Sequence, residues 1–374
     1  MIRVLLEYAA GALAALLLLI PCRAWARRRA AGACGRAARL LVAGAVVSAW
    51  LFAVNAALAP LNQAFTLRPL FFSMMTVFWL LGVFVPLGAL GAAFRPGPWG
   101  ARLALGLFGL VALGVSVDAN LVEPRRVTAP RREIVLAGAP TAGLRVAHLS
   151  DVQTDYLGRR EREALRHVQG FDPDLVVLTG DYANGGLEHR EAAAGARWLA
   201  ERLRARYGVF AVTGDEGTPE DDTAIFAGTP VRLLRNEAVR IDTPGGPIWV
   251  AGTDRMDPDQ GRALCGIPRE EFCILLQHRP ERVRSLPGRG VDLFLCGHTH
   301  GGQVAIPGFG PLTTLCALGR RYDRGVFDWE GVPFHICAGL GMEGRWAPRV
   351  RFWCPPEVAL LTVRRGEAGR RLAE

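Results

Sequence analysis

Two histidines lie in a glycine-rich turn that directly follows an apolar segment of the chain. The turn reads Gly-His-Thr-His-Gly-Gly at residues 297–302, and the apolar segment before it spans residues 291–296. A short apolar run of this length predicts a buried β-strand, and the flanking glycines let the backbone turn tightly. The chain has only seven histidines, and neutral imidazole is the commonest side-chain ligand of metals. The segment therefore predicts a metal site at the end of a strand.

Four further apolar runs end in the same way, with an acid, an amide or a histidine. They span residues 144–149, 174–178, 207–212 and 273–277. In layered α/β folds, ligands bind beyond the carboxyl ends of the strands, so we expect these polar side chains to meet at one edge. A mixture of oxygen and nitrogen ligands suits a pair of divalent ions such as Mn, Fe or Zn. The candidate residues are Asp151, Gln153, Asp181, Asp215, Glu216, His278, His298 and His300.

The order of these motifs resembles the calcineurin-like metallophosphoesterase superfamily. Its members read Asp-x-His, Gly-Asp-x-x-Asp/Asn, Gly-Asn-His-Asp/Glu, His and then Gly-His-x-His. The membrane-associated bacterial branch is the most similar, because it shares Leu-Arg-Asn-Glu at 234–237, Ala-Gly-Leu-Gly at 338–341, Pro-Arg-Val-Arg at 348–351 and Cys-Pro-Pro-Glu at 354–357. The resemblance covers about residues 143–364. It implies an α/β fold, the four-layer αββα sandwich, and metal-dependent hydrolysis of a phosphoric ester.

The resemblance assigns most of the candidate residues to two metal positions. Asp151, Asp181 and His300 match ligands of the first metal. His278 and His298 match ligands of the second metal. Asp181 matches the residue that bridges the two ions, so the resemblance implies a dinuclear centre.

Three positions depart from the family pattern. Gln153 replaces the histidine of the first motif, and its amide oxygen would take that ligand position. Asp215 stands where the family has an asparagine ligand, and Glu216 stands where a histidine assists the leaving group. Glu216 has three readings: a general acid, an extra metal ligand, or a solvated residue after a turn. Asn184 matches a family position, where it either orients a ligand or caps the turn.

These departures make the predicted site richer in oxygen ligands and less positive. Asp215 and Glu216 each add a negative charge, whereas Gln153 exchanges a nitrogen donor for an oxygen donor. Oxygen-rich sites favour Mn or Mg over Zn, and a less positive site favours a monoanionic diester over a dianionic monoester. We therefore expect two divalent metal ions, Mn above all, with Fe, Zn or Mg as alternatives. The predicted enzyme is a phosphodiesterase or pyrophosphatase that uses a metal-activated hydroxide.

The N-terminal third of the chain differs from the rest in composition. It contains four apolar spans, Val4–Ile20, Leu40–Leu58, Leu70–Phe94 and Leu103–Val117. Crossing a bilayer takes about 20 residues, so residues 1–120 predict a transmembrane region of about four helices. Residues 121–142 then form a linker, 143–364 the metallophosphoesterase domain, and 365–374 a charged tail.

The distribution of charge predicts how the chain is placed in a membrane. Residues 1–120 hold ten of the 44 basic residues, all of them arginines, but only two of the 35 acids. This excess flanks apolar spans, so it indicates membrane topology rather than a nucleic-acid partner. The loop between the first two spans is rich in arginine and should be cytoplasmic. With four spans, the catalytic domain lies on the periplasmic or extracellular side of a bacterial membrane, where the substrate could be lipid-linked.

Two other kinds of protein remain as alternatives. A degenerate metallophosphoesterase would hold a metal or phosphate without turnover and act as a regulatory membrane protein. The five retained family ligands favour an enzyme instead. A transporter fits less well, because the spans contain few ionisable residues.

The remaining histidines and cysteines have simpler interpretations. We expect His148 to be packed in the core rather than bound to metal, and His335 lies in a similar apolar run. His167 falls in a charged, helix-like stretch and should lie at the surface. Cys265 and Cys273 are the nearest cysteines in the domain and the best candidates for a disulfide.

Overall fold

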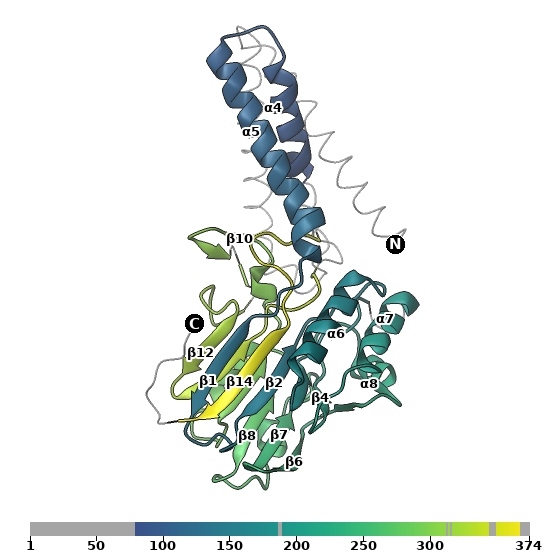
Figure 1. Ribbon diagram of the computed structural model, residues 1–374, viewed down its shortest axis with the longest axis vertical. Helices are drawn as coiled ribbons and strands as arrows, with labels where there is room; N and C mark the ends of the chain where they lie inside the picture. Colours follow the sequence, from purple (N-terminus) through teal and green to yellow (C-terminus); the bar gives the residue numbers. More distant parts are fainter. Residues whose placement is uncertain (1–78, 186–188, 312, 315, 344–348, 367–374) are drawn as a thin grey trace. The chain divides into compact units, whose positions relative to one another are not determined.

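The computed structural model describes residues 79–185, 189–311, 313–314, 316–343 and 349–366 (Figure 1). The chain divides into two compact units, Met1–Val122 with Gly344–Arg349, and Glu123–Glu343 with Val350–Glu374.

The described part of the first unit is a pair of helices with irregular ends. A π-helical turn η1 (Leu80–Phe84) leads into α4 (Val85–Ala93), and α5 (Trp99–Val117) leads into a second π-helical turn, η2 (Asp118–Val122). The two helices approach closely at Gly109, where a Cβ atom would lie 2.6 Å from Cγ of Leu90. Arg102 Nε donates to the carbonyl of Ala93 at 2.8 Å, which satisfies an acceptor at the end of α4.

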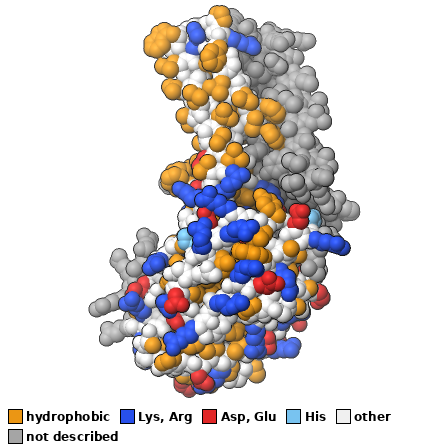
Figure 2. Space-filling view, turned by 45° about the vertical axis from the view of Figure 1, so that its right-hand side comes forward, with side chains coloured by type: hydrophobic (Ala, Val, Ile, Leu, Met, Phe, Trp, Pro, Cys, Tyr) orange, Lys and Arg blue, Asp and Glu red, His pale blue; other side chains and the backbone are white. Residues whose placement is uncertain are grey.

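Apolar side chains dominate the outer surface of this helix pair (Figure 2). Leu110 and Val111 are 60% and 65% exposed. Within the described residues, one helical stretch, Trp99–Arg125, is long and apolar enough to cross a membrane. Of the predicted spans, 103–117 lies inside it and 70–94 is described only from residue 79. The spans at 4–20 and 40–58 lie outside the described residues, so a region of four transmembrane helices stays a prediction.

Two six-stranded sheets form the second unit (Figure 1). The first sheet has the order β1 (Arg131–Leu136), β14 (Ala359–Arg365), β2 (Leu144–Leu149), β3 (Leu175–Leu178), β4 (Val209–Ala211), β5 (Val231–Leu233). The second has the order β12 (Gly325–Trp329), β13 (Val332–Ile336), β9 (Leu293–Cys296), β8 (Phe272–Leu276), β7 (Gly246–Gly252), β6 (Glu237–Thr243). A short hairpin pairs β10 (Ala305–Ile306) with β11 (Gly310–Pro311).

Three hydrophobic clusters hold the layers of the second unit together. Between the sheets, Val146 and Val177 of the first sheet belong to the same fully buried cluster as Ile274 of the second. Full burial of such a side chain contributes about 1.5–3 kcal/mol. The other two clusters lie on the outer faces of the sheets. Strands that are apolar on both faces, as these runs are, need cover on both sides.

Helices provide the cover, unequally on the two sides. The first sheet is covered by α6 (Arg159–Phe171), α7 (Arg190–Ala200) and α8 (Pro219–Phe226) (Figure 1). The second sheet has only the short α9 (Gln260–Ala263), the 3-10 helix η5 (Pro280–Ser285) and loops. The predicted α/β fold class and its paired sheets are confirmed, with a thinner outer layer on the second sheet.

The segment expected to link the two regions contributes to the sheet instead. After the 3-10 turn η3 (Glu123–Arg125), strand β1 pairs in parallel with β14, with Arg131 opposite Leu360. The prediction of a linker over 121–142 is therefore wrong for residues 131–136. Strand β1 takes the edge position, where its charged first residues remain accessible. Its pattern was hidden because Arg131, Arg132 and Glu133 interrupt the apolar run.

Parallel pairing aligns the strand ends that carry the candidate residues. Strands β2, β3 and β4 are parallel neighbours in the first sheet. Strands β8 and β9 are parallel neighbours in the second. Their carboxyl ends therefore open onto a common edge, as sequence predicted.

Candidate metal centre

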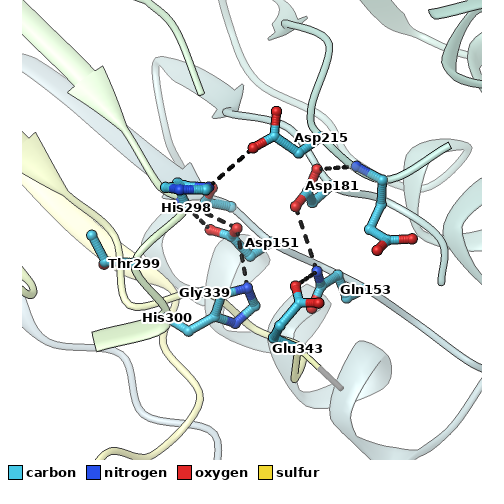
Figure 3. A network of polar contacts seen from close by, with 12 residues as sticks. Asp151, Gln153, Asp181, Asp215, His298, Thr299, His300, Gly339 and Glu343 are labelled. Carbon is cyan, nitrogen blue, oxygen red and sulfur yellow. Dashed lines mark hydrogen bonds and ion pairs between the residues drawn. The ribbon is translucent and has the colours of Figure 1, made fainter. Parts of the chain in front are cut away.

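The loops after five strands bring the predicted residues together (Figure 3). The loops that leave β2, β3 and β4 carry acids and amides. The loops that leave β8 and β9 carry the histidines, and His300 begins the 3-10 helix η6 (His300–Gly302). Figure 3 shows Asp151, Asp181, Asp215, His298 and His300 around one small region.

The backbone at this edge adopts an uncommon conformation. Asp151, Asp181, His298 and His300 have positive φ angles of 46°, 56°, 70° and 51°, and Gln153 has 33°. Few non-glycine residues adopt this left-handed region. Each costs roughly 1–3 kcal/mol, and such residues cluster at functional sites. The surrounding contacts therefore force these side chains toward one another.

Glycines make the close approach of the loops possible. A Cβ atom on Gly214 would lie 2.0 Å from the backbone nitrogen of Asp181. A Cβ atom on Gly297 would lie 1.8 Å from Oγ of Ser150 and 2.4 Å from Oδ2 of Asp151. Both distances are too short for any side chain, so the glycines of the Gly-Asp and Gly-His motifs are required by packing.

One group of ligand atoms lies between the β4, β8 and β9 loops. Asp215, His278 and His298 each offer an atom within 4.8 Å of the others. The distance from His298 Nδ1 to Asp215 Oδ2 is 3.2 Å, and that from His278 Nε2 to Asp181 Oδ2 is 3.4 Å. His278 Nδ1 donates to the carbonyl of Thr179 at 2.7 Å, which leaves Nε2 free to bind an ion. This group corresponds to the predicted second metal position.

Two further groups of ligand atoms include Asp181. Asp151, Asp181 and His278 form one, and Asp181, His300 and Glu343 form another. His300 Nε2 lies 3.4 Å from Asp151 Oδ1. Asp181 belongs to both of these groups, whereas His278 belongs to the first of them and to the group with Asp215 and His298. Glu343 was missed from the sequence, because it follows no strand and belongs to no motif with metal-ligand spacing.

Gln153 faces the site through its amide nitrogen. Nε2 donates to Glu343 Oε2 at 2.9 Å and lies 3.4 Å from Asp181 Oδ2. Its Oε1 atom is buried and has no hydrogen-bond partner among the described residues. Coordination of an ion through this amide oxygen stays a prediction.

Asn184 and Glu216 lie beside the ligands. Asn184 Nδ2 donates to the carbonyl of Gln153 at 2.8 Å and to Asp155 Oδ1 at 3.1 Å, so it braces the loop after β2. The backbone N–H of Glu216 donates to Asp181 Oδ1 at 2.8 Å. Its carboxylate accepts from the N–H of Gly185 at 3.3 Å and belongs to none of the metal-binding groups found among the described residues.

Asp215 is also held by two arginines that sequence reasoning did not identify. Arg279 donates through Nε and Nη2 to Asp215 Oδ2 at 2.9 and 2.8 Å. Arg255 Nε lies 3.2 Å from Oδ1. Burial opposes ionisation of Asp215, but hydrogen bonding by His298 and Arg279 lowers its pKa. The extra negative charge at this position is therefore partly offset.

Burial and neighbouring charges set the ionisation of the remaining ligands. Burial alone would lower the pKa of His278, but the carboxylates of Asp181 and Asp151 raise it to about 10. Burial raises the pKa of Asp151 to about 6. For Asp181, burial is outweighed by His278, which lowers the pKa to about 2. Metal ions compete with protons for these same atoms, so metal affinity should depend on pH.

The remaining predicted residues lie away from the ligands. His148 is fully buried, as expected, and its Nδ1 lies 3.0 Å from Nδ1 of His335. Neither belongs to a metal-binding group. Cys265 is exposed and Cys273 is buried, and both are free thiols, so the suggested disulfide between them is wrong.

Comparison with known proteins agrees with this fold and site. The family model described as calcineurin-like phosphoesterase matches residues 144–302. "Uncharacterized metallophosphoesterase YkuE" of Bacillus subtilis is 26% identical over 279 residues, which cover 69% of this chain and 95% of that protein. An "Uncharacterized metallophosphoesterase" of Aquifex aeolicus is 30% identical over 238 residues, 59% of this chain and 85% of that protein. The chain belongs to the calcineurin-like phosphoesterase family.

The name of one animal relative combines a metallophosphoesterase domain with a transmembrane protein. "Transmembrane protein with metallophosphoesterase domain" of Bos taurus is 28% identical over 281 residues, which cover 68% of this chain and 62% of that protein. Membership of the family implies a metal-dependent phosphoesterase with a dinuclear metal centre. The three groups of ligand atoms are the candidate position of that centre in this chain.

Proposed function

We propose that this protein is a membrane-anchored, metal-dependent phosphoesterase that hydrolyses a phosphodiester or a pyrophosphate. The observation that carries the proposal is the set of three adjoining groups of ligand atoms, of which two share Asp181 and two share His278. Two ions held there would polarise the phosphoryl oxygens and lower the pKa of a bound water. The family membership fits this chemistry, and the finer choice of substrate rests on the charge of the site.

The residues present fit a pair of divalent ions. His300 Nδ1 is buried and has no hydrogen-bond partner among the described residues, which is costly unless another group uses the nitrogen. In our proposal, Asp151, Asp181 and His300 hold the first ion. Asp181, Asp215, His278 and His298 hold the second ion.

The charge of the site supports a diester or pyrophosphate over a monoester. Asp215 replaces a neutral asparagine of the family, and Glu343 adds a carboxylate beside the first ion. Arg255 and Arg279 offset Asp215, so the net change is close to one added negative charge. A dianionic monoester loses more attraction from this change than a monoanionic diester does. The same oxygen-rich ligands favour Mn over Zn.

Glu216 is the residue we assign to proton transfer. Its backbone N–H donates to Asp181 Oδ1 at 2.8 Å, which places residue 216 beside the metal ligands. A general acid contributes about 10²–10⁴-fold. We expect Glu216→Gln to slow the hydrolysis of diesters with alkyl leaving groups by that factor. Bis-p-nitrophenyl phosphate, whose leaving group needs no proton, should be nearly unaffected, and an equal loss on both substrates would contradict the assignment.

The membrane part of the proposal rests on the apolar stretch Trp99–Arg125. Arginine-rich loops earlier in the chain favour a catalytic domain on the periplasmic or extracellular side. A reporter enzyme that is active only in the cytoplasm, fused to the C-terminus, should then be inactive. An active reporter would reverse the proposed orientation.

Hydrolysis assays on the full-length protein in detergent micelles test the enzymatic part. With Mn²⁺, we expect turnover of bis-p-nitrophenyl phosphate that exceeds turnover of p-nitrophenyl phosphate. His300→Ala should reduce kcat/KM by at least about 100-fold, the upper end of losses seen for partners of metal ligands. His167→Ala, on the accessible side of α6, is the matched control and should retain full activity.

Two outcomes would overturn parts of the proposal. Equal turnover of both substrates with Zn²⁺ as the best metal would remove the diester assignment. Metal binding without any turnover across several divalent ions would favour the alternative, a degenerate site that binds metal or phosphate for regulation.

A further inference from the structure

Glu343 lies at the first metal position although no family motif contains it. One of its carboxylate oxygens lies within 4.8 Å of ligand atoms of Asp181 and His300. Figure 3 shows Glu343 beside Gln153, on the side of the centre that also holds His300. The family has a histidine where this chain has Gln153, so the first metal position lacks one of its usual nitrogen ligands.

The amide nitrogen of Gln153 holds two carboxylates. This atom, Nε2, donates to Glu343 and lies within reach of Asp181. The reverse orientation of the amide would place its oxygen against two carboxylate oxygens, so the hydrogen-bond network defines which end faces the site. The amide group therefore positions the two acids beside each other.

A second observation marks the same place as a ligand site. His300 is only 4% exposed, and its Nδ1 atom has no hydrogen-bond partner among the described residues. His300 belongs to the same group of ligand atoms as Glu343. A buried imidazole nitrogen of this kind is costly unless it binds something.

The backbone that carries Glu343 is fixed from three directions. The N–H of Gly341 donates to the carbonyl of Asp151 at 2.6 Å. Gln303 Nε2 donates to the carbonyl of Glu343 at 3.2 Å. The buried guanidinium of Arg351 donates through Nε to the carbonyl of Gly341 at 2.9 Å. These contacts place residue 343 beside the loop that carries Asp151.

We propose that Glu343 is a ligand of the first metal ion and takes the place of the histidine that Gln153 has replaced. The inference rests on the proposed function, since it requires a metal ion at the first position. Gln153 becomes a positioning residue that holds Glu343 and Asp181 through its amide nitrogen. The exchange replaces a neutral nitrogen ligand by an anionic oxygen ligand.

The exchange also defines which ions the site should select. Anionic oxygen ligands are hard donors, which favour Mn²⁺ or Mg²⁺, whereas imidazole suits Zn²⁺. The first position of this chain should therefore prefer Mn²⁺ more strongly than a site with the family histidine would.

Metal counting on the full-length protein in detergent tests the inference without reference to turnover. Wild-type protein loaded with Mn²⁺, passed through a desalting column and analysed by inductively coupled plasma mass spectrometry should hold about two ions per chain. Glu343→Gln should hold about one, and titration calorimetry should show a loss of at least about 100-fold in the affinity of one site. Glu270→Gln, an exposed acid on the same domain, is the matched control and should bind like the wild type.

A compensating variant separates a ligand role from a structural one. Gln153→His combined with Glu343→Gln restores the family's histidine and should recover the second ion, now with a shift in preference from Mn²⁺ toward Zn²⁺. Two tightly bound Mn²⁺ ions in Glu343→Gln would overturn the inference. Loss in the single variant with no recovery in the double variant would contradict the replacement of the histidine by Glu343.

These outcomes can be told apart from failure of the proposed function. If the wild type hydrolyses diesters while Glu343→Gln keeps both ions, only the role of Glu343 is wrong. If the wild type binds two ions but hydrolyses nothing, the enzymatic proposal fails and the ion counts still decide the role of Glu343. A wild-type protein that binds no metal would overturn both.

Discussion

Substitution of Arg351 should destabilise the catalytic domain more than most other single substitutions. Its side chain is fully buried, and its hydrogen-bond partners among the described residues include no carboxylate. Instead, the guanidinium donates to five backbone carbonyls, those of Ala338, Gly339, Gly341, Cys354 and His300. These carbonyls belong to the loops that hold the first metal position.

The expected cost of Arg351→Met follows from opposing contributions. The carbonyls of His300 and Gly339 also accept from the backbone N–H groups of Gln303 and Glu357, so three carbonyls lose their donor. Each costs about 1–3 kcal/mol, which gives a gross loss of about 3–9 kcal/mol. Removing the buried charge recovers several kcal/mol of desolvation per ion. The free energy of unfolding should therefore fall by about 3–5 kcal/mol, similar to the loss when one partner of a buried charged pair is removed.

Urea unfolding of the full-length protein in detergent, followed by tryptophan fluorescence, measures this loss. With an m-value of about 1–3 kcal/mol per molar urea, the midpoint should fall by at least about 1 M. Arg351→Lys should be intermediate, because an ammonium group offers three donors to five acceptors. Arg289→Met removes an exposed arginine and should leave the midpoint unchanged. A shift for Arg351→Met no larger than that of this control would show that the guanidinium does not stabilise these loops.

Three further predictions follow from the site and its surroundings. Gly214→Ala forces a Cβ atom to 2.0 Å from the nitrogen of Asp181, so it should abolish tight metal binding in calorimetry even where the protein still folds. Asp215→Asn restores the neutral ligand of the family and should raise the ratio of monoester to diester turnover. Burial and Arg132 lower the pKa of His148 from 6.5 to about 3, so the unfolded chain binds the proton more readily and stability falls as pH drops from about 6.5 toward 3. The slope is up to about 1.4 kcal/mol per pH unit, and urea unfolding of His148→Gln should show a shallower decline, whereas an unchanged pH profile would contradict it.

The sequence was most informative where a ligand directly follows a strand. Asp151, Asp181 and His298 each come within a few residues of an apolar run, and parallel pairing of those runs brings the residues to one edge. The positions of the apolar runs along the chain are enough to predict this placement, because the carboxyl ends of parallel strands lie at the same edge of a sheet. The fold class and the meeting of these residues could therefore be expected.

Features that depend on contacts between distant loops could not be expected in the same way. Glu343 lies in an irregular segment whose position is set by Arg351 and Gln303. The charge of Asp215 was foreseen, but its pairing with Arg279 was not. No local pattern in the sequence encodes these contacts, because each depends on a single side chain and joins residues that are 10 to 64 positions apart.

Strand β1 shows a different kind of limit. Its first three residues are Arg131, Arg132 and Glu133, which obscure the apolar pattern of an edge strand. Arg132 Nη1 pairs with Glu357 Oε1 at 3.0 Å, so part of the charge is satisfied within the fold. Edge strands often carry charges, since these discourage pairing with other chains, and this makes them harder to recognise than central strands.

If two ions held around Asp181 are needed for phosphoester hydrolysis, turnover must follow the number of ions bound per chain. Full-length protein is stripped of metal and titrated with Mn²⁺, while the ions bound per chain and the hydrolysis of bis-p-nitrophenyl phosphate are followed on the same samples. Turnover should stay low while the first ion binds and should rise as the second binds, to about two ions per chain. Full turnover in metal-free protein, or with one ion per chain, would contradict a need for two ions.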